Sequence, residues 1–249
     1  MLQTITADFY RLLRSKGFWL AEMGFCATLI LISLSGSVVK VGVHEKAPDF
    51  SNQIHSAYEF VIQLTTSHSS VVLFTVILLL MVIGVDLRQK LYKNLLTVGI
   101  SRRAFFLDKF IVIALLAGLQ FILYYGLGFL IAVVFSSIGT APAHFVPQFS
   151  TILFIQYLAS LAWVSLLLLV LYATQSTIAV FLTFLFGSSL LGIPAIFFPD
   201  IEWFKYLNME VNYSLANQPE VLIKITLVAC CLIILFGTLG YRIFKTKDL

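Results

Sequence analysis

Six long apolar stretches separated by short polar segments dominate the hydropathy pattern of this chain. They cover residues 17–37, 69–85, 110–135, 151–173, 178–198 and 221–241. Each stretch falls in the range of about 17–25 residues that a helix needs to cross a bilayer. The apolar residues are continuous rather than alternating, which excludes a transmembrane β-barrel. The pattern predicts an all-α polytopic membrane protein with six transmembrane helices in a single transmembrane domain, residues 1–249.

Residues 1–16 have the period of an amphipathic helix. One face carries the apolar side chains Leu2, Ile5, Phe9, Leu12 and Leu13. Polar residues, among them Asp8 and Arg11, are expected opposite or beside that face. Such a helix lies in the membrane interface with its apolar side in lipid. A simple positive anchor for the first span is the alternative, and the two interpretations are compatible.

Residues 86–109, which we call the elbow, form the only long charged segment between two apolar stretches. The elbow carries six cations: Arg88, Lys90, Lys93, Arg102, Arg103 and Lys109. Apolar residues four apart, at Leu87, Leu91 and Leu95, predict a short helix. Gly99 can end that helix because glycine enters the left-handed conformation without penalty. Ser101 is then expected to cap the next helix, which continues into the membrane.

Most of the 16 Lys and Arg residues lie before the first span, in the elbow or after the last span. The opposite side holds only Lys40, Lys46, Lys205 and Lys224. Positively charged segments stay in the cytosol. Both termini and the elbow are therefore predicted to be cytoplasmic, and residues 199–220 extracellular. The net charge of +4 does not indicate a nucleic-acid partner, because the basic residues lie at the ends of spans.

Composition agrees with a membrane protein. Hydrophobic residues make up 60% of the chain and charged residues 11%, with a mean hydropathy of +0.98. The three cysteines lie inside apolar spans, where thiols behave as small hydrophobes, so we expect no disulfide. We expect no cleavable signal peptide, since no small-residue cleavage site follows the first span.

Several polar or small residues inside the spans are candidates for function. Glu22 lies one to two turns inside the first span, where a carboxylate costs a few kcal/mol unless it is paired or hydrated. It is expected to face other helices, in a structural ion pair or in a functional role. The candidates to line a substrate path, with interhelical hydrogen bonds as the alternative, are Gln120, Gln156, Ser160 and Ser165.

The fifth span carries a face of small residues that includes Gly187, Ser188 and Gly192. Small residues allow close approach of helices. This face is a candidate interface between two copies of the chain or a site of packing within the chain. Pro194 and Pro199 are expected to bend or end the same helix.

The outer segments offer no predicted metal site. Residues 51–64 are expected to form a surface helix on this side. The four histidines do not have the spacing of metal ligands, and we interpret them as solvated loop residues: His44, His55, His68 and His144.

The sequence lacks the motifs of the common catalytic classes. No Walker motif is present, so the chain is not expected to hydrolyse ATP by itself. The sequence contains no H-E-x-x-H zinc-binding motif and no G-x-S-x-G motif of a serine nucleophile. The spans also lack the chains of carboxylates and histidines used by proton-driven carriers. We therefore do not expect an enzyme.

The span layout and the elbow together resemble the membrane subunit of ABC exporters of the second class, the ABC-2 type permeases. In that family an acidic residue ends the second span, and a short helix, a turn, a Ser-Arg pair, apolar residues and a Lys follow. The matching positions here are Asp86, Lys93, Asn94, Gly99, Ser101, Arg102, Phe105, Phe106 and Lys109. The Lys-Asn variants resemble permeases of bacteriocin or lantibiotic immunity and of peptide export. Asp86 replaces a frequent Glu, and Gln89-Lys90 replaces a frequent Gly-Thr pair.

This resemblance implies a permease subunit that forms the translocation path for an amphipathic peptide or hydrophobic compound in a bacterial plasma membrane. It implies two copies of a cytosolic ABC ATPase, which would bind ATP and Mg, and a second permease copy, identical or a paralogue. This chain itself would bind membrane lipid but no cofactor. The residues implied to orient or contact the ATPase are Asp86, Arg88, Lys93, Asn94, Arg102 and Lys109.

Two other functions remain open from the sequence. The first is a membrane immunity or binding protein that sequesters a ligand without transport. The second is an ATP-independent channel or carrier. The elbow itself has an alternative interpretation as a positive anchor that binds anionic lipid.

Overall fold

The computed structural model describes residues 2–35, 56–65, 69–89, 91, 99–135, 138–208 and 221–246. The described part of the chain is helical and contains no strand. Its elements are α1 (Leu2–Leu13), α2 (Lys16–Ser35), α3 (Ala57–Leu64), α4 (Ser69–Leu79), the π-helix η2 (Leu80–Gly84), α5 (Val85–Arg88), α7 (Arg102–Phe135), α8 (Phe145–Thr174), α9 (Thr177–Phe197), the 3₁₀-helix η3 (Glu202–Leu207) and α11 (Leu222–Thr246).

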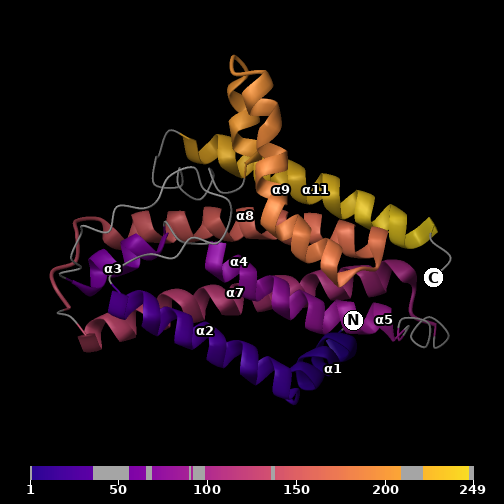
Figure 1. Ribbon diagram of the computed structural model, residues 1–249, viewed down its shortest axis with the longest axis horizontal. Helices are drawn as coiled ribbons and strands as arrows, with labels where there is room; N and C mark the ends of the chain where they lie inside the picture. Colours follow the sequence, from indigo (N-terminus) through magenta and orange to yellow (C-terminus); the bar gives the residue numbers. More distant parts are fainter. Residues whose placement is uncertain are drawn as a thin grey trace.

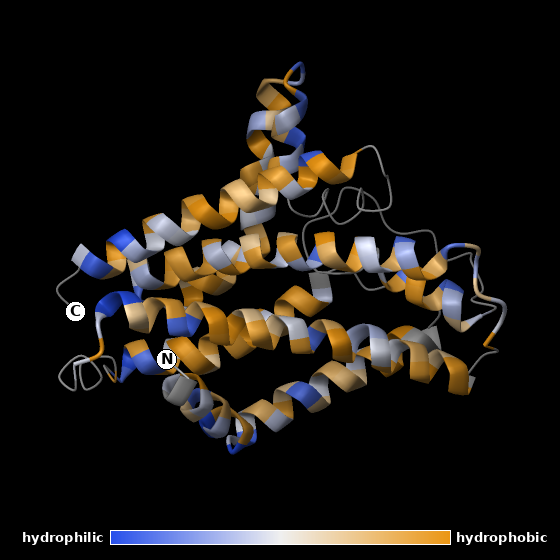
Figure 2. Cartoon of the chain, turned by 180° about the vertical axis from the view of Figure 1, so that it is seen from behind, coloured by the Kyte–Doolittle hydropathy of each residue, from blue (hydrophilic) through white to orange (hydrophobic). Residues whose placement is uncertain are grey.

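Five helical segments are long and apolar enough to cross a membrane: Ser70–Arg88, Arg102–Val134, Phe145–Thr174, Thr177–Phe197 and Leu222–Thr246. A sixth crossing requires α1 and α2 to count together as one broken span, bent by 69°. Hydrophobic residues predominate along the long helices (Figure 2). The described part of the chain is therefore a bundle with five helices that are long and apolar enough to cross a membrane, joined by the bent pair α1 and α2.

Helix α7 is the centre of the bundle and packs on α1, α2, α3, α4, α8 and α11. It has 34 residues, so it is about 50 Å long and exceeds a hydrocarbon core of about 30 Å. It begins directly after Ser101, whose hydroxyl accepts a hydrogen bond from the Ala104 N–H at 3.1 Å. Gly99 before it has a φ of 96°. The predicted serine cap is confirmed, and Gly99 has the positive φ that was expected of it, but most of the short helix predicted before Gly99 lies outside the described residues. The end of the elbow is continuous with the third span.

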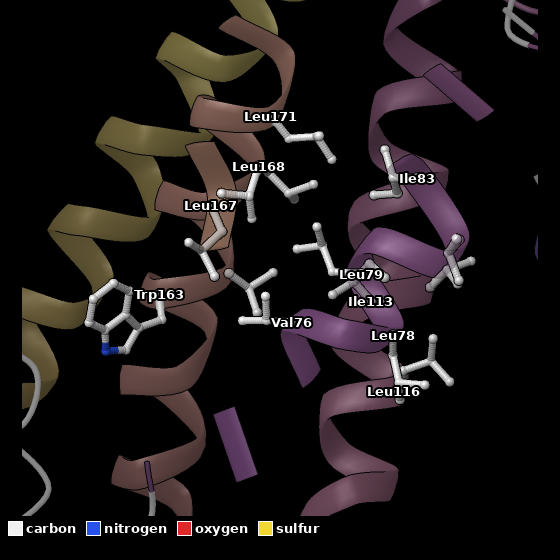
Figure 3. Close-up of a cluster of buried hydrophobic side chains, with 14 of the residues drawn as sticks. Val76, Leu78, Leu79, Ile83, Ile113, Leu116, Trp163, Leu167, Leu168 and Leu171 are labelled. Carbon is white, nitrogen blue, oxygen red and sulfur yellow. The ribbon is translucent and has the colours of Figure 1, made fainter. Parts of the chain in front are cut away.

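Two large hydrophobic cores and a small one around Ile155, Tyr206 and Ile225 occur in the described part of the bundle. In the larger core, leucines of α8 face the side chains of α4, η2 and α7 (Figure 3). The second core joins α2, α3, α4 and α7 around Phe25, Phe60 and Tyr124. Gly128 of α7 allows α3 to approach, because a Cβ there would lie 2.4 Å from the Leu64 side chain. The prediction of a surface helix is therefore wrong for Ala57–Leu64, because Phe60 and Leu64 of this helix are buried against α7.

Helix α9 follows α8 after a two-residue turn and diverges from the rest of the bundle (Figure 1). Ser176 caps it by accepting a hydrogen bond from the Ala179 N–H at 3.3 Å. Pro194 lies inside the helix, and Pro199 follows its end. In η3, which follows α9, Glu202 accepts a hydrogen bond at 2.7 Å from Lys224 of α11, which holds the pKa of that carboxyl below its ordinary value.

Candidate functional site

Four charged side chains meet where α1 lies against the base of the elbow, and we call them the ion cluster. They are Asp8, Arg11, Asp86 and Lys109. The Lys109 Nζ lies 2.6 Å from Asp8 Oδ2 and 2.6 Å from Asp86 Oδ2. The Arg11 guanidinium lies 2.5 Å from Asp86 Oδ1 and 3.5 Å from Asp8 Oδ1. Two carboxylates and two cations therefore alternate, and their charges cancel.

Burial makes this pairing necessary. Asp8 is 7% exposed, Asp86 2% and Lys109 1%, and Arg11 closes the solvent side of the cluster. An ion removed from water is costly unless opposite charges and hydrogen bonds compensate it. The Lys109 Nζ also lies 5.3 Å from the centre of the Phe105 ring, an additional favourable contact for a cation. The four charges therefore depend on one another, because removing one of them would leave a buried charge without compensation.

Asp8 is buried on the packed face of α1. Asp8 lies three residues after Ile5 and four before Leu12, which places it on the same helix face as those residues. That face packs on the bundle, with Leu12 buried and Ile5 and Phe9 against the larger core. The prediction of a position opposite or beside the apolar face therefore did not include the burial of Asp8. The i, i+3, i+7 spacing of Ile5, Asp8 and Leu12 is the signal that points to a buried partner for this carboxylate.

The π-helix η2 brings the end of the second span to the cluster. A π-helix leaves the ordinary helical hydrogen-bond pattern, and such segments are frequent at functional sites. The Arg11 Nη2 donates a hydrogen bond to the Val82 carbonyl in η2 at 3.1 Å, while Nη1 binds Asp86. Arg11 therefore secures both the irregular turn and the carboxylate that follows it.

The elbow residues singled out from the sequence fall into three groups. Asp86 and Lys109 are buried in the ion cluster, so they are able to orient the elbow but present no surface to a partner. Arg102 joins α7 to the end of α11, since its Nη1 donates to the Lys245 carbonyl at 2.8 Å and to the Phe244 carbonyl at 3.4 Å. Arg88 is exposed at the end of α5. Lys93 and Asn94 lie outside the described residues.

A further buried carboxylate, Asp108, is adjacent in the sequence to Lys109 of the cluster. Asp108 is 1% exposed, and neither of its oxygens has a hydrogen-bond partner within the described ranges. Its neighbour Lys109 points to Asp8 and Asp86 instead. The two adjacent residues thus show opposite situations, a fully paired cation and an unpaired acid.

Gln156 occupies the middle of a polar network between three helices. The Tyr125 hydroxyl donates to Gln156 Oε1 at 2.6 Å, and Gln156 Nε2 donates to the Thr65 carbonyl at 2.7 Å. Ser160 and Ser165 donate to backbone carbonyls one turn earlier in α8. All the polar candidates for a substrate path are buried in this conformation, and the contacts of Gln156 are those of an interhelical bridge.

Replacing Gln156 with Leu is expected to lower the free energy of unfolding by about 1–3 kcal/mol. The substitution preserves the approximate volume but removes the hydrogen bonds that Gln156 makes with the Tyr125 hydroxyl and the Thr65 carbonyl. Thermal unfolding of the purified protein in detergent measures the change. The matched control is Gln148→Leu at the exposed start of α8, which is expected to change stability by less than about 0.5 kcal/mol.

Glu22 is bound by an amide rather than by a cation. Gln120 Nε2 of α7 donates a hydrogen bond to Glu22 Oε1, and both residues are buried. The expected structural ion pair is not what the structure shows: the partner is neutral, and Gln120 is part of a bridge between α2 and α7. Glu22 Oε2 and Gln120 Oε1 have no hydrogen-bond partner within the described residues.

Because the partner of Glu22 is neutral, Glu22→Gln is expected to retain or raise the melting temperature. The amide oxygen of the new side chain still accepts the hydrogen bond from Gln120. The neutral side chain also avoids the free-energy cost of burying a carboxylate. Glu22→Ala removes the acceptor and is expected to cost about 1–2 kcal/mol. Thermal unfolding in detergent compares the two variants. Equal damage by both would show that Glu22 needs its carboxyl group for something other than this bridge.

The small residues of α9 pack within the chain. A Cβ at Gly187 would lie 3.2 Å from the Trp163 ring of α8, and one at Gly192 would lie 3.1 Å from the Asn208 amide nitrogen. The Ser188 hydroxyl donates to Asn208 Oδ1 at 2.6 Å. Of the two interpretations offered for this face, the contacts are those of intramolecular packing.

The histidines and other possible metal ligands form no cluster in the part of the chain that is described. His144 precedes α8 with a φ of 58° and lines a cavity of about 620 Å³ together with Phe145 and Thr65. His44, His55 and His68 lie outside the described residues.

Comparison with known protein families gives a match over most of the chain. A family model described as ABC-2 family transporter protein matches residues 4–189. The matched segment contains the ion cluster, the elbow and the bridges made by Gln120 and Gln156. No curated protein and no solved structure matches the chain.

Proposed function

Because this chain belongs to the ABC-2 transporter family and is a multi-pass membrane protein, we propose that it is the permease subunit of an ATP-binding cassette exporter. The family normally works with a cytosolic ABC ATPase, which supplies the ATP hydrolysis that this chain has no motif to perform. The substrate would be an amphipathic peptide or another hydrophobic compound, as in peptide export or bacteriocin immunity. The complex would contain two ATPases, with their ATP and Mg, and a second permease copy, identical or a paralogue.

The ion cluster is the observation that best supports this proposal. It joins α1, the end of the second span and the start of the third span through short charged contacts. Arg102 adds the end of α11 to the same group. A displacement of the elbow would therefore move four helices together. Such joint movement is what a rigid-body switch between an inward-open and an outward-open conformation requires.

The exposed part of the elbow is the proposed surface for the ATPase. Arg88 lies at the exposed end of α5, and we assign the same role to Lys93 and Asn94, which follow it in the sequence. Charged side chains on such a surface form short, strong hydrogen bonds with carboxylates of a partner. Asp86 and Lys109 would hold the base of the elbow rather than bind the ATPase. The elbow would face the cytosol of a bacterial cell, as the distribution of Lys and Arg predicts.

Co-purification from the native membrane tests this function. A tagged chain is expected to retain a protein with a Walker motif and to show ATPase activity in that preparation. Two results would contradict the proposal. Protection of cells from a peptide while the partner ATPase is inactive would indicate sequestration. Solute flux in proteoliposomes made from this chain alone would indicate an ATP-independent channel or carrier.

A further inference from the structure

An apolar groove of about 370 Å³ lies between α7 and α11, near the end of the bundle that contains the elbow (Figure 1). We call it the α7–α11 groove. Its wall consists mainly of Phe106, Leu107 and Phe110 from α7 and Ile234, Gly237 and Tyr241 from α11. A Cβ added at Gly237 would meet nothing within 4 Å, so the groove is unfilled at this position. A narrow apolar groove on a membrane-spanning surface has the shape and chemistry to hold an acyl chain.

Cations lie at one end of this groove. Arg103 lines it directly and lies one turn before Phe106 and Leu107 on α7. Lys245 lies one turn after Tyr241 and therefore continues the groove face of α11. Both side chains are exposed. The hydrogen bonds from Arg102 to the Phe244 and Lys245 carbonyls keep the two helix ends together.

The local backbone also favours an anion here. The first turn of α7 lies at the same end of the groove, and the N-terminus of a helix carries a partial positive charge. The C-terminus of α11 carries the opposite partial charge, but Arg102 covers its last carbonyls. The groove thus combines an apolar body with a positively charged end.

We propose that the α7–α11 groove binds an anionic phospholipid, with one acyl chain along Gly237 and the phosphate between Arg103 and Lys245. A soluble phosphate would use the cations but not the apolar wall. A second copy of this chain placed symmetrically on the groove would bring the same cations near their equivalents, which disfavours that contact. Basic pockets between transmembrane helices on the cytoplasmic side bind anionic headgroups in the same way.

Native mass spectrometry of the purified full chain, delipidated and titrated with dioleoyl phosphatidylglycerol or dioleoyl phosphatidylcholine, tests the site. The wild-type protein is expected to retain phosphatidylglycerol preferentially. Each of Arg103→Gln and Lys245→Gln is expected to weaken phosphatidylglycerol binding about fivefold, and the double variant about thirtyfold. Gly237→Trp fills the groove and is expected to weaken binding of both lipids.

Two matched controls separate the site from general effects. Arg14→Gln removes one exposed charge from the same predicted side of the membrane and is expected to leave lipid binding unchanged. Gly126→Trp adds the same bulk at another glycine that has open space around it, and is also expected to have no effect.

Three results would overturn the proposal. The first is wild-type retention of phosphatidylglycerol in both Gly237→Trp and the double charge variant. The second is equal affinity for phosphatidylglycerol and phosphatidylcholine, which would leave the cations without a role. The third is a dimer of the wild-type chain that Gly237→Trp abolishes, which would assign the groove to a second copy. None of these outcomes depends on the presence of the ATPase, so the lipid site and the proposed function are tested separately.

Discussion

Replacing Lys109 with Met is expected to lower the free energy of unfolding by about 3–5 kcal/mol, the largest effect that we predict for a single substitution. Met fills a similar volume but removes the cation between Asp8 and Asp86, which lie 2.6 Å from the Lys109 Nζ. The two buried carboxylates then repel each other, and Arg11 alone compensates them. Chemical or thermal unfolding of the purified protein in detergent measures the change.

The neighbouring residue provides a matched control. Asp108 is as deeply buried as Lys109, but it has no hydrogen-bond partner among the described residues. Asp108→Asn is therefore expected to leave stability unchanged or to raise it, because an unpaired buried charge is costly. A second variant, Lys109→Met with Asp8→Asn, is expected to recover part of the loss. If Lys109→Met were no more harmful than Asp108→Asn, the ion cluster would not hold the base of the elbow.

Reversing the charge of Arg88 and Lys93 together is expected to weaken binding of the ATPase by about 10–100-fold. The double Glu variant places two acidic groups on the proposed docking surface, and juxtaposed like charges cost several kcal/mol. Folding should persist because Arg88 is exposed and lies outside the ion cluster. The measurements are the amount of ATPase that co-purifies, the ATPase activity of the complex and the melting temperature of the permease.

The matched control for this variant lies at the other end of the bundle. Lys205→Glu with Lys224→Glu makes the same change in net charge on the segments predicted to be extracellular, and Lys224 is exposed beside Glu202. This control is expected to leave ATPase binding unchanged. If both double variants bound the ATPase as tightly as the wild type, the elbow would not be the docking surface. If only the control lost binding, the predicted orientation of the chain would be reversed.

Structural features that depend on a few consecutive residues could be predicted well from the sequence. The positive φ of Gly99 and the cap at Ser101 are both present in the structure. Each depends on the chemistry of a few consecutive residues, such as the freedom of glycine at positive φ or the hydroxyl of a capping serine. The membrane-spanning lengths follow for a similar reason, because bilayer thickness sets how many apolar residues a crossing needs.

The candidate site could be predicted only in part. The elbow and its residues Asp86 and Lys109 were identified, but as part of a surface that orients or meets a partner rather than as buried ions. The burial of Asp8 could not be predicted, because its partner Lys109 is on a distant segment of the chain. Glu22 was expected to pair with a cation, and its partner is the amide of Gln120. In each case the missing information was the identity of a residue far away in the chain.

By itself the sequence determined the class of this protein, the approximate positions of its spans and the ends of the elbow, because the period, capping and length of a segment are local properties. Only the tertiary structure decided which charges pair, which polar residues bridge helices and which elbow residues remain exposed. The ion cluster joins residues separated by 75 and 101 positions in the chain. No local pattern encodes such a contact, since it exists only when α1, α5 and α7 pack together and exclude water from the charges between them.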